Sequence, residues 1–153
     1  MGDATSEAIN KLVKGGLAKP EEICGCSAAE IAEIEAASGH AAQLPAQYRS
    51  FLREMGRSAG HFLRGTDVFY PQILKLRNIA LALLRECAVG WSLGSHDFVF
   101  SSHQGYQFLF FDWSRGDDPP VMLFLEGDTE PRQVFASFSE WLRQSVRDEL
   151  GET

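Results

Sequence analysis

The segment FLFFDW, residues 108–113, constrains the fold more than any other part of the chain. As a strand it places Phe108 and Phe110 on one face and Leu109, Phe111 and Trp113 on the other, because successive strand side chains point to opposite faces. A strand that is apolar on both faces belongs inside a sheet that is covered on both sides. We therefore expect helices against one face, and either loops or a partner against the other.

The residues around this segment predict an antiparallel meander. Residues 97–102 and 106–113 are rich in Phe and Val, and the stretch Ser102-His103-Gln104-Gly105 between them is typical of a tight hairpin connection. Further strands are expected at 61–63, as a short edge strand, at 121–126 and at 133–135. Polar stretches rich in Gly and Pro, at 112–120 and 127–131, separate the later strands.

A helix is predicted over residues 44–56, LPAQYRSFLREMG, where the apolar residues recur at the spacing of one helical face. The face consists of Leu44, Tyr48, Phe51, Leu52 and Met55. Pro45 suits the first helical position, and Gly56 suits a C-terminal cap. The helix is amphipathic and should pack on another layer.

Four more helices are indicated by capping signals and apolar spacing. The capping boxes Ser27–Glu30 and Ser137–Glu140 begin two of them. The predicted helices are 4–14 with Ile9, Leu12 and Val13 on one side, 27 to Ser38-Gly39, 71–87, and one from 137 with Phe138, Trp141, Leu142 and Val146 on its apolar face. The fold class is α+β, with N-terminal helices and a C-terminal helix packed on a twisted, mainly antiparallel sheet of about four to six strands.

The helix at 71–87 carries a broad apolar stripe, formed by Ile73, Leu76, Ile79, Ala80, Leu83 and Leu84. Such a stripe is buried either between layers of the same chain or against a partner subunit. A homodimer is therefore an open alternative at this point.

Size and charge narrow the classes of function. A chain of 153 residues that is 44% hydrophobic fits one domain, 1–153, with residues 1–20 as a helical extension. The net charge of −7 disfavours nucleic acid as a direct partner and permits a basic protein partner. No stretch approaches the about 18 apolar residues of a membrane span, and no signal peptide is visible. Together with an odd number of cysteines, this predicts a cytoplasmic protein with reduced thiols.

Acidic residues gather in two parts of the sequence. Between Glu21 and Tyr48 there are five carboxylates and no Lys or Arg, and between Asp112 and Glu130 there are six carboxylates and one arginine, Arg115. Either region is a solvated face or a field that attracts a cationic partner. Because an aromatic side chain beside acids suits an interface, the predicted partner-binding residues are Trp113, Asp117, Asp118, Glu126, Asp128 and Glu130.

Enzymatic motifs do not stand out. The four histidines, His40, His61, His96 and His103, belong to no zinc-protease, nucleophile-elbow or phosphate-loop pattern. His96-Asp97 and His103 flank one predicted strand and could face one end of the sheet as a metal site, although loop residues are the simpler interpretation. Cys24-Gly25-Cys26 is too tight for a zinc knuckle. The sequence predicts no enzyme, cofactor or metal.

The order of these elements resembles the SUKH superfamily, which comprises Smi/Knr-type domains of fungal cell-wall regulators and many bacterial immunity proteins. The resemblance rests on an acidic, Ile-rich helix before LP-x-x-YR-x-FL-x-x-x-G, then GYQFLFFD, VMLFLEG and VFASFSEWL, and it covers about residues 27–146. It implies a bacterial immunity protein that docks on a cognate polymorphic toxin, often a nuclease or deaminase, and occludes it without chemistry of its own. The fungal members imply the alternative, a non-catalytic module with a cellular partner in a cell-wall or regulatory role.

Overall fold

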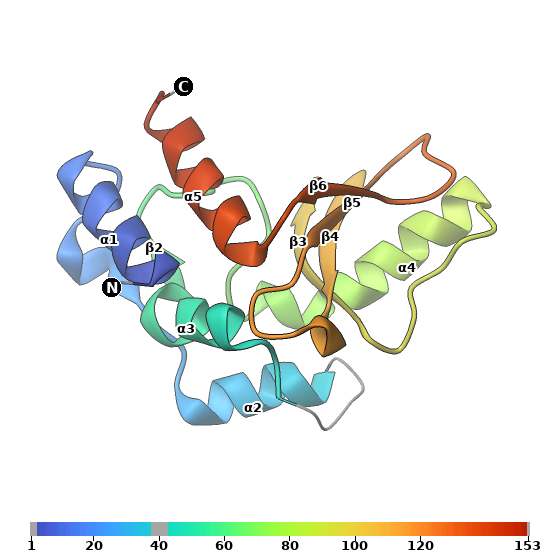
Figure 1. Cartoon of the computed structure of the whole chain (residues 1–153), viewed down its shortest axis with the longest axis horizontal. Coiled ribbons are helices and arrows are strands. Elements are labelled where there is room, and N and C mark those ends of the chain that lie inside the picture. Colours follow the sequence, from blue (N-terminus) through green and yellow to red (C-terminus); the bar gives the residue numbers. More distant parts are fainter. Residues whose placement is uncertain (1–2, 38–42, 153) are drawn as a thin grey trace.

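The structure, a computed structural model, describes residues 3–37 and 43–152 and has strand β4 (Gln107–Asp112) inside a four-stranded sheet. The sheet is an antiparallel meander in the order β3-β4-β5-β6, with β3 (Asp97–His103), β5 (Val121–Leu125) and β6 (Arg132–Phe135). Helices α3 and α5 lie on one side of it and α4 lies on the other (Figure 1). The predicted α+β class and the inner position of β4 are confirmed.

The face of the sheet that carries Phe111 packs against α3 (Ala46–Met55) and α5 (Phe138–Glu149). Tyr48 of α3 lies at the centre of this layer, with its ring centroid 5.3 Å from those of Phe98, Phe111 and Phe138. Tyr48, Phe111 and Phe138 are each at most 1% exposed. The apolar face predicted for residues 44–56 therefore packs on the sheet and on α5.

The opposite face of the sheet, with Phe110 and Phe124, is covered by the chain itself. Trp91 stacks over Phe110 and Phe124 at centroid distances of 5.4 and 6.4 Å. It follows α4 (Leu76–Cys87), which is preceded by the 3-10 turn η2 (Gln72–Lys75). The stripe of α4 is buried between layers, at Ile73, Leu76, Ala80, Leu83 and Leu84. Ile79, the sixth residue of the predicted stripe, is partly buried, so the stripe packs mainly within the chain.

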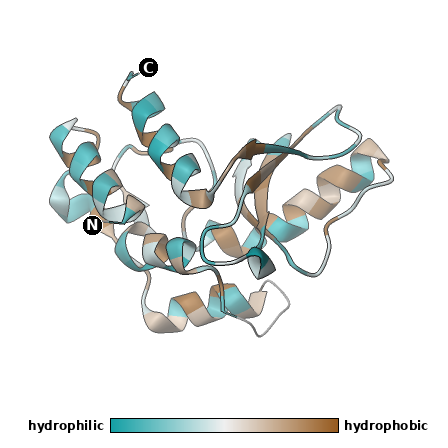
Figure 2. Ribbon diagram, in the orientation of Figure 1, coloured by the Kyte–Doolittle hydropathy of each residue, from teal (hydrophilic) through white to brown (hydrophobic). Residues whose placement is uncertain are grey.

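Helix α1 (Ala4–Lys14) packs against α3 and α5 and extends the core toward the N-terminus. Asp3 caps it by accepting a hydrogen bond from the Ser6 N–H at 2.9 Å. The buried residues are Ala4, Thr5, Ala8 and Leu12, whereas Ile9 and Val13 are only partly buried. The predicted apolar side was wrong in part, because small residues line the contact and let α1 approach its neighbours closely. Figure 2 shows the many hydrophilic residues that α1 and α5 carry on their other sides.

Helix α2 (Ala28–Ala37) begins with the predicted capping box. The Ser27 N–H donates to Glu30 Oε1 at 2.9 Å, and the Glu30 N–H donates to Ser27 Oγ at 3.1 Å. The predicted end of this helix at Ser38-Gly39 lies outside the described residues. Helix α3 begins at Ala46, so Pro45 is the capping residue rather than the first helical one.

Gly56 is the C-terminal cap of α3, as predicted, and its N–H donates to the Leu52 carbonyl oxygen at 3.1 Å. Its φ of −70° is ordinary for any residue, so no left-handed cap is formed. A Cβ at this position would lie 2.6 Å from the Leu52 carbonyl oxygen and 2.8 Å from Cys26 Sγ. The glycine is needed because the chain before α2 passes directly against the end of α3.

The edge strand predicted at 61–63 was wrong. The pairing falls instead on β2 (Ser58–Ala59) and β1 (Ile23–Cys24), which follows the turn η1 (Pro20–Glu22). The Phe62 N–H donates to the Ala59 carbonyl oxygen at 3.1 Å, which turns the chain away from a ladder. Leu63 then takes a left-handed conformation with φ of 54°.

Candidate partner-binding surface

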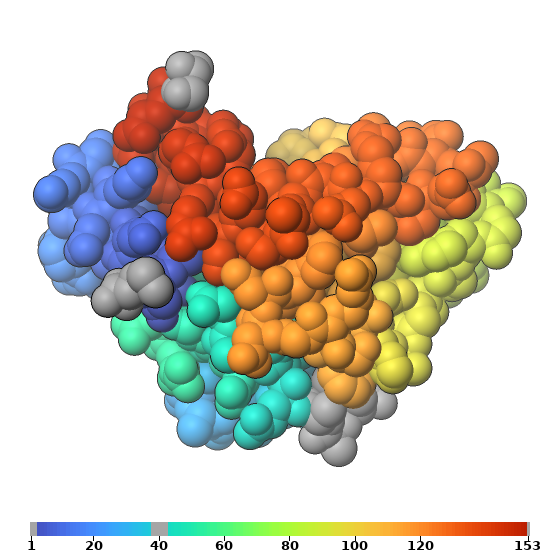
Figure 3. All heavy atoms as spheres, in the orientation of Figure 1, coloured from blue at the N-terminus to red at the C-terminus, as the bar shows by residue number. Residues whose placement is uncertain are grey.

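The six predicted partner-binding residues form two groups, one at each end of β5. Trp113, Asp117 and Asp118 precede the strand, and Glu126, Asp128 and Glu130 follow it. A five-residue strand is about 16 Å long, so the two groups do not form one patch. Figure 3 shows both segments on one side of the molecule, the loop after β4 in orange and the turn after β5 in red-orange. We refer to them as the loop group and the turn group.

Trp113 of the loop group is held by its own surroundings. It begins the short 3-10 helix η3 (Trp113–Arg115) and is partly buried. Its ring meets that of His96 edge to face at 4.8 Å, and its Nε1–H donates to the Ser95 carbonyl oxygen at 3.4 Å. The Trp113 side chain therefore packs against the segment before β3 and is only partly accessible to a partner.

Asp118 of the loop group stabilises the start of α5. Its Oδ1 accepts a hydrogen bond from the Ser139 N–H at 2.9 Å, while Ser137 Oγ accepts one from the Glu140 N–H at 3.1 Å. The neighbouring Asp117 accepts a backbone hydrogen bond from the Gln47 N–H at 3.0 Å, and its side chain is exposed. The loop therefore joins β5 to α3 and α5, and Asp117 is its exposed acid.

The turn group also divides into one structural and two exposed acids. Asp128 Oδ2 accepts a hydrogen bond from the Leu125 N–H at 3.1 Å and forms an ion pair with Arg132 at 3.5 Å. These contacts close the turn between β5 and β6. Glu126 and Glu130 are exposed on either side of Asp128.

Tyr106 lies beside the turn group and was missed from the sequence. It is 37% exposed and is the one exposed large hydrophobic side chain among the residues that the structure describes. Its carbonyl oxygen accepts a hydrogen bond from the Glu126 N–H at 2.8 Å. The turn before it has positive φ at Gln104 (52°) and Gly105 (79°), as the predicted tight hairpin requires. The sequence feature that could have identified Tyr106 is its place directly after a predicted hairpin turn.

The N-terminal acidic region is largely used inside the fold. Four of its five carboxylates accept hydrogen bonds from the chain, Glu22 from the Lys19 N–H, Glu30 from the Ser27 N–H, Glu33 from the Tyr70 hydroxyl and Glu35 from the Leu44 N–H. Glu30 also pairs with Arg57, which lowers the pKa of the Glu30 carboxyl after the larger effect of the Ser27 N–H. This region stabilises the packing of α2 more than it offers a free acidic surface.

The expectation that His96-Asp97 and His103 face one end of the sheet was wrong. His96 precedes β3 and His103 ends it, and a seven-residue strand separates them by roughly 20 Å. His103 Nδ1 lies 3.0 Å from Thr66 Oγ1. Within residues 3–37 and 43–152, no group of three His, Cys, Asp or Glu could hold a metal ion.

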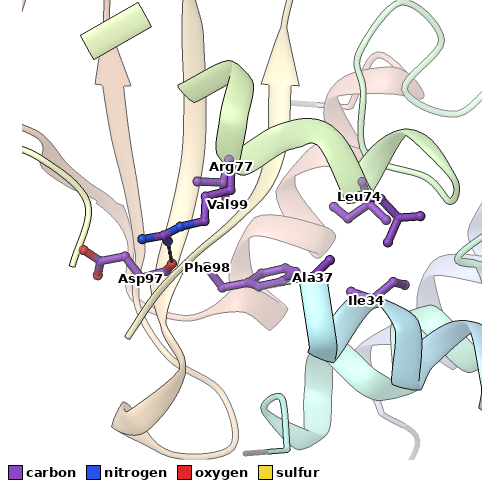
Figure 4. A pocket seen from close by; sticks show the side chains of 8 residues that line it. Ile34, Ala37, Leu74, Arg77, Asp97, Phe98 and Val99 are labelled. Atoms are coloured by element: carbon purple, nitrogen blue, oxygen red, sulfur yellow. Dashed lines mark hydrogen bonds between the residues drawn. The ribbon is translucent and has the colours of Figure 1, made fainter. Parts of the chain in front are cut away.

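Asp97 lies at the edge of a small pocket between α2, η2, α4 and β3, and its carboxylate points away from Ile34 and Ala37 (Figure 4). Burial raises the pKa of the Asp97 carboxyl, and the charge of Asp112 directly across the ladder adds to this. Arg77 donates to the Asp97 carbonyl oxygen at 2.7 Å and to the Gly94 carbonyl oxygen at 3.2 Å, and the Gly94 N–H donates to Asp97 Oδ2 at 2.8 Å. The cavity of about 10 Å³ has room for a single water. The hydrogen bonds of Arg77 join α4 to the start of β3.

The cysteines are unpaired thiols. Burial raises the pKa of the Cys26 thiol to about 11, so it stays protonated and unreactive at neutral pH. Its position against Gly56 is a packing contact. None of the described helices is long and apolar enough to cross a membrane.

These features define a small α+β domain with a rigid aromatic core, acids that order its turns and a few exposed acids at the two ends of the sheet. Residues 25–144 match the SMI1/KNR4 family (SUKH-1), and the chain belongs to this family. The family includes toxin immunity proteins and Smi1/Knr4 regulators, and SUKH domains are generally non-catalytic immunity or interaction modules. The match begins after α1, and no curated protein matches the sequence. The predicted membership, over about residues 27–146, is confirmed.

Proposed function

We propose that this protein is an immunity protein that binds a cognate polymorphic toxin and occludes its active or substrate-binding surface. The observation that carries the proposal is the family match over residues 25–144, since members of this family commonly bind a cognate toxin. The protein acts by binding and makes or breaks no bond. Its unpaired thiols suit the reducing cytoplasm of a bacterium, where the toxin has to be neutralised.

The charge of the chain supports a basic toxin of the nuclease or deaminase class. A nuclease approaches phosphates with clustered Lys and Arg, and the net charge of −7 complements such a surface. Exposed acids, among them Asp117, Glu126 and Glu130, extend the negative field into solvent. Complementary fields raise the association rate, which matters for an inhibitor that must reach a toxin before its substrate does.

The rigid aromatic layer supports inhibition by a preformed surface. Tyr48 is in ring contact with Phe51, Phe98, Phe100, Phe111 and Phe138, and all six residues are at most 5% exposed. A surface built on such a core is ordered before it meets its partner, so little conformational entropy is lost on binding.

A second candidate is a non-catalytic module with a cellular partner in a regulatory or cell-wall role. It is favoured by the Smi1/Knr4 regulators in the same family. The neighbouring gene separates the two, because a toxin-bearing reading frame directly upstream belongs with immunity and an isolated locus belongs with the cellular role.

Co-expression tests the proposal. The toxin encoded beside this gene is induced in a sensitive host with or without the chain, and purified toxin is titrated with purified chain in its own activity assay. We expect survival, one-to-one inhibition, and association that slows as salt rises, because exposed charges are screened beyond about 10 Å at 0.1 M. Absence of both protection and binding, or turnover of a small molecule by the chain alone, overturns the proposal.

A further inference from the structure

The face of the sheet next to α5 is open at the end where β5 leads into the turn group. Ser101, Leu109 and Leu123 lie directly across from one another on neighbouring strands, and so do His103, Gln107 and Leu125. Directly opposed residues share a face of the sheet. Leu109 is partly buried against the core, whereas Leu123 and Leu125 are partly exposed and belong to no core cluster. Arg132 of β6 lies across from Leu123 on the same face. This end of the face therefore combines partly exposed leucines with polar side chains and is incompletely covered.

A groove continues from this face toward α5. It has a volume of about 160 Å³ and is lined by Leu63, Thr66, Ser101, His103, Gln107, Phe108, Leu109 and Trp141. Through Leu63 and Thr66 it adjoins a second hollow of about 270 Å³ along residues 57–69. Leu63 has a left-handed conformation, and its N–H donates to Glu149 Oε1 at 2.7 Å. The groove is thus fixed by the fold.

The charges around this region are mainly negative. Glu126 and Glu130 are exposed at the turn, and Glu149 and Asp67 lie beside the groove. Arg57 and Arg64 line the second hollow. Arg57 is paired with Glu30, and Arg132 is paired with Asp128. Two copies of this chain meeting through the same face would bring like charges together, so a cationic partner fits better than a second copy.

Resting on the proposed function, we infer that the toxin docks at this end of the sheet. A basic segment of the toxin places one apolar side chain in the groove between Leu63, Leu109 and Trp141. Its Lys or Arg residues meet Glu126 and Glu130. Tyr106 lies on the rim, where an exposed aromatic ring can pack against an arginine. The loop group lies at the other end of β5 and stays outside the interface.

Affinity measurements on the full chain test this assignment. The probe is the toxin domain encoded beside the gene, inactivated at its catalytic residue. The variants are Tyr106→Ala and the double charge reversal Glu126→Lys with Glu130→Lys. The matched control is Asp117→Lys, which changes an exposed acid at the opposite end. Thermal unfolding confirms that each variant is folded.

Tyr106→Ala should weaken binding by at least about tenfold, as expected for an interface anchor. The double reversal should slow association strongly at low salt, and Asp117→Lys should stay within about twofold of the unmodified chain. If the unmodified chain binds and only Asp117→Lys weakens it, the toxin docks at the loop group and this inference fails while the proposed function stands. If the unmodified chain does not bind the toxin, the proposed function fails, and the inference that rests on it fails with it. A homodimer in sedimentation that Tyr106→Ala dissociates would assign the face to a second copy and overturn the inference.

Discussion

Substitution of Asp118 tests whether this acid stabilises the fold or is available to a partner. Asp118→Ala removes the acceptor of the Ser139 N–H, one of the first backbone donors of α5. Loss of a capping acceptor costs about 1 kcal/mol, with a range of about 0.5–2 kcal/mol. A carboxylate near a helix N-terminus contributes about 0.3–1 kcal/mol more through the helix dipole. We therefore expect the free energy of unfolding to fall by about 1–2 kcal/mol.

The assay is urea unfolding at pH 7, followed by circular dichroism and supported by thermal melts. In a domain of this size, each kcal/mol lowers the melting temperature by about 2–4 °C. Asp118→Asn keeps an acceptor oxygen and loses the charge, so it should cost less than Asp118→Ala. Asp117→Ala is the matched control, because its exposed side chain should change stability by less than about 0.5 kcal/mol.

Equal stability of Asp118→Ala and the unmodified chain would refute the capping role. An equal loss from Asp117→Ala would refute it too, since the effect would then follow from charge in the loop and not from the hydrogen bond. The outcome also bears on binding. Reversing Asp117, Asp118 and Asp128 together would perturb α5 and a turn as well as any interface, so Asp117, Glu126 and Glu130 are the informative sites.

Three further predictions concern buried or capping polar groups. Asp3→Ala should destabilise the chain at pH 7: the Ser50 hydroxyl, 2.6 Å away, and the Ser6 N–H lower the pKa of Asp3, so urea midpoints should show its contribution above about pH 3.8 and its loss as pH falls through the folded pKa. Asp97→Asn should stabilise the chain at pH 7: burial raises the pKa of Asp97, ionisation there opposes folding, and the gain should vanish in melts below pH 3.8. Tyr48→Phe should raise the melting temperature slightly or leave it unchanged, because the buried Tyr48 hydroxyl has no hydrogen-bond partner among the described residues.

Local signals in the sequence predicted most of the fold. The apolar residues on both faces of 108–113 located the inner strand, and the capping box at Ser27 marked the start of α2. These features can be recognised from a few consecutive residues, because a helix cap or a strand face depends only on residues that are close in the sequence. The cover of the second sheet face was left open, since it depends on Trp91 and α4 meeting β4 and β5 across the chain.

The partner surface was less accessible to sequence reasoning for a physical reason. In a sequence, Asp117 and Asp118 are equivalent acids in one loop. In the fold, the Asp118 carboxylate accepts a hydrogen bond from the Ser139 N–H 21 positions away. Asp117 accepts its hydrogen bond, from the Gln47 N–H, through the backbone carbonyl oxygen, and its side chain is exposed. Tyr106 is exposed because the sheet ends there, although its neighbours Phe108 and Phe110 are buried. Long-range hydrogen bonds and the limits of each layer decide which side chains remain free, and neither has a local signature.

Asp128 stabilises the turn that carries two exposed acids, Glu126 and Glu130. Its hydrogen bond with the Leu125 N–H and its ion pair with Arg132 fix the turn between β5 and β6. Glu126 and Glu130 are therefore carried on an ordered turn. An ordered turn loses less entropy when a partner binds than a mobile one does, so the two exposed charges are more useful than the same charges on a free loop. The same reasoning applies to Leu63 at the groove, whose N–H donates to the Glu149 carboxylate. In this chain the structural acids and the exposed acids are neighbours, and the first set positions the second.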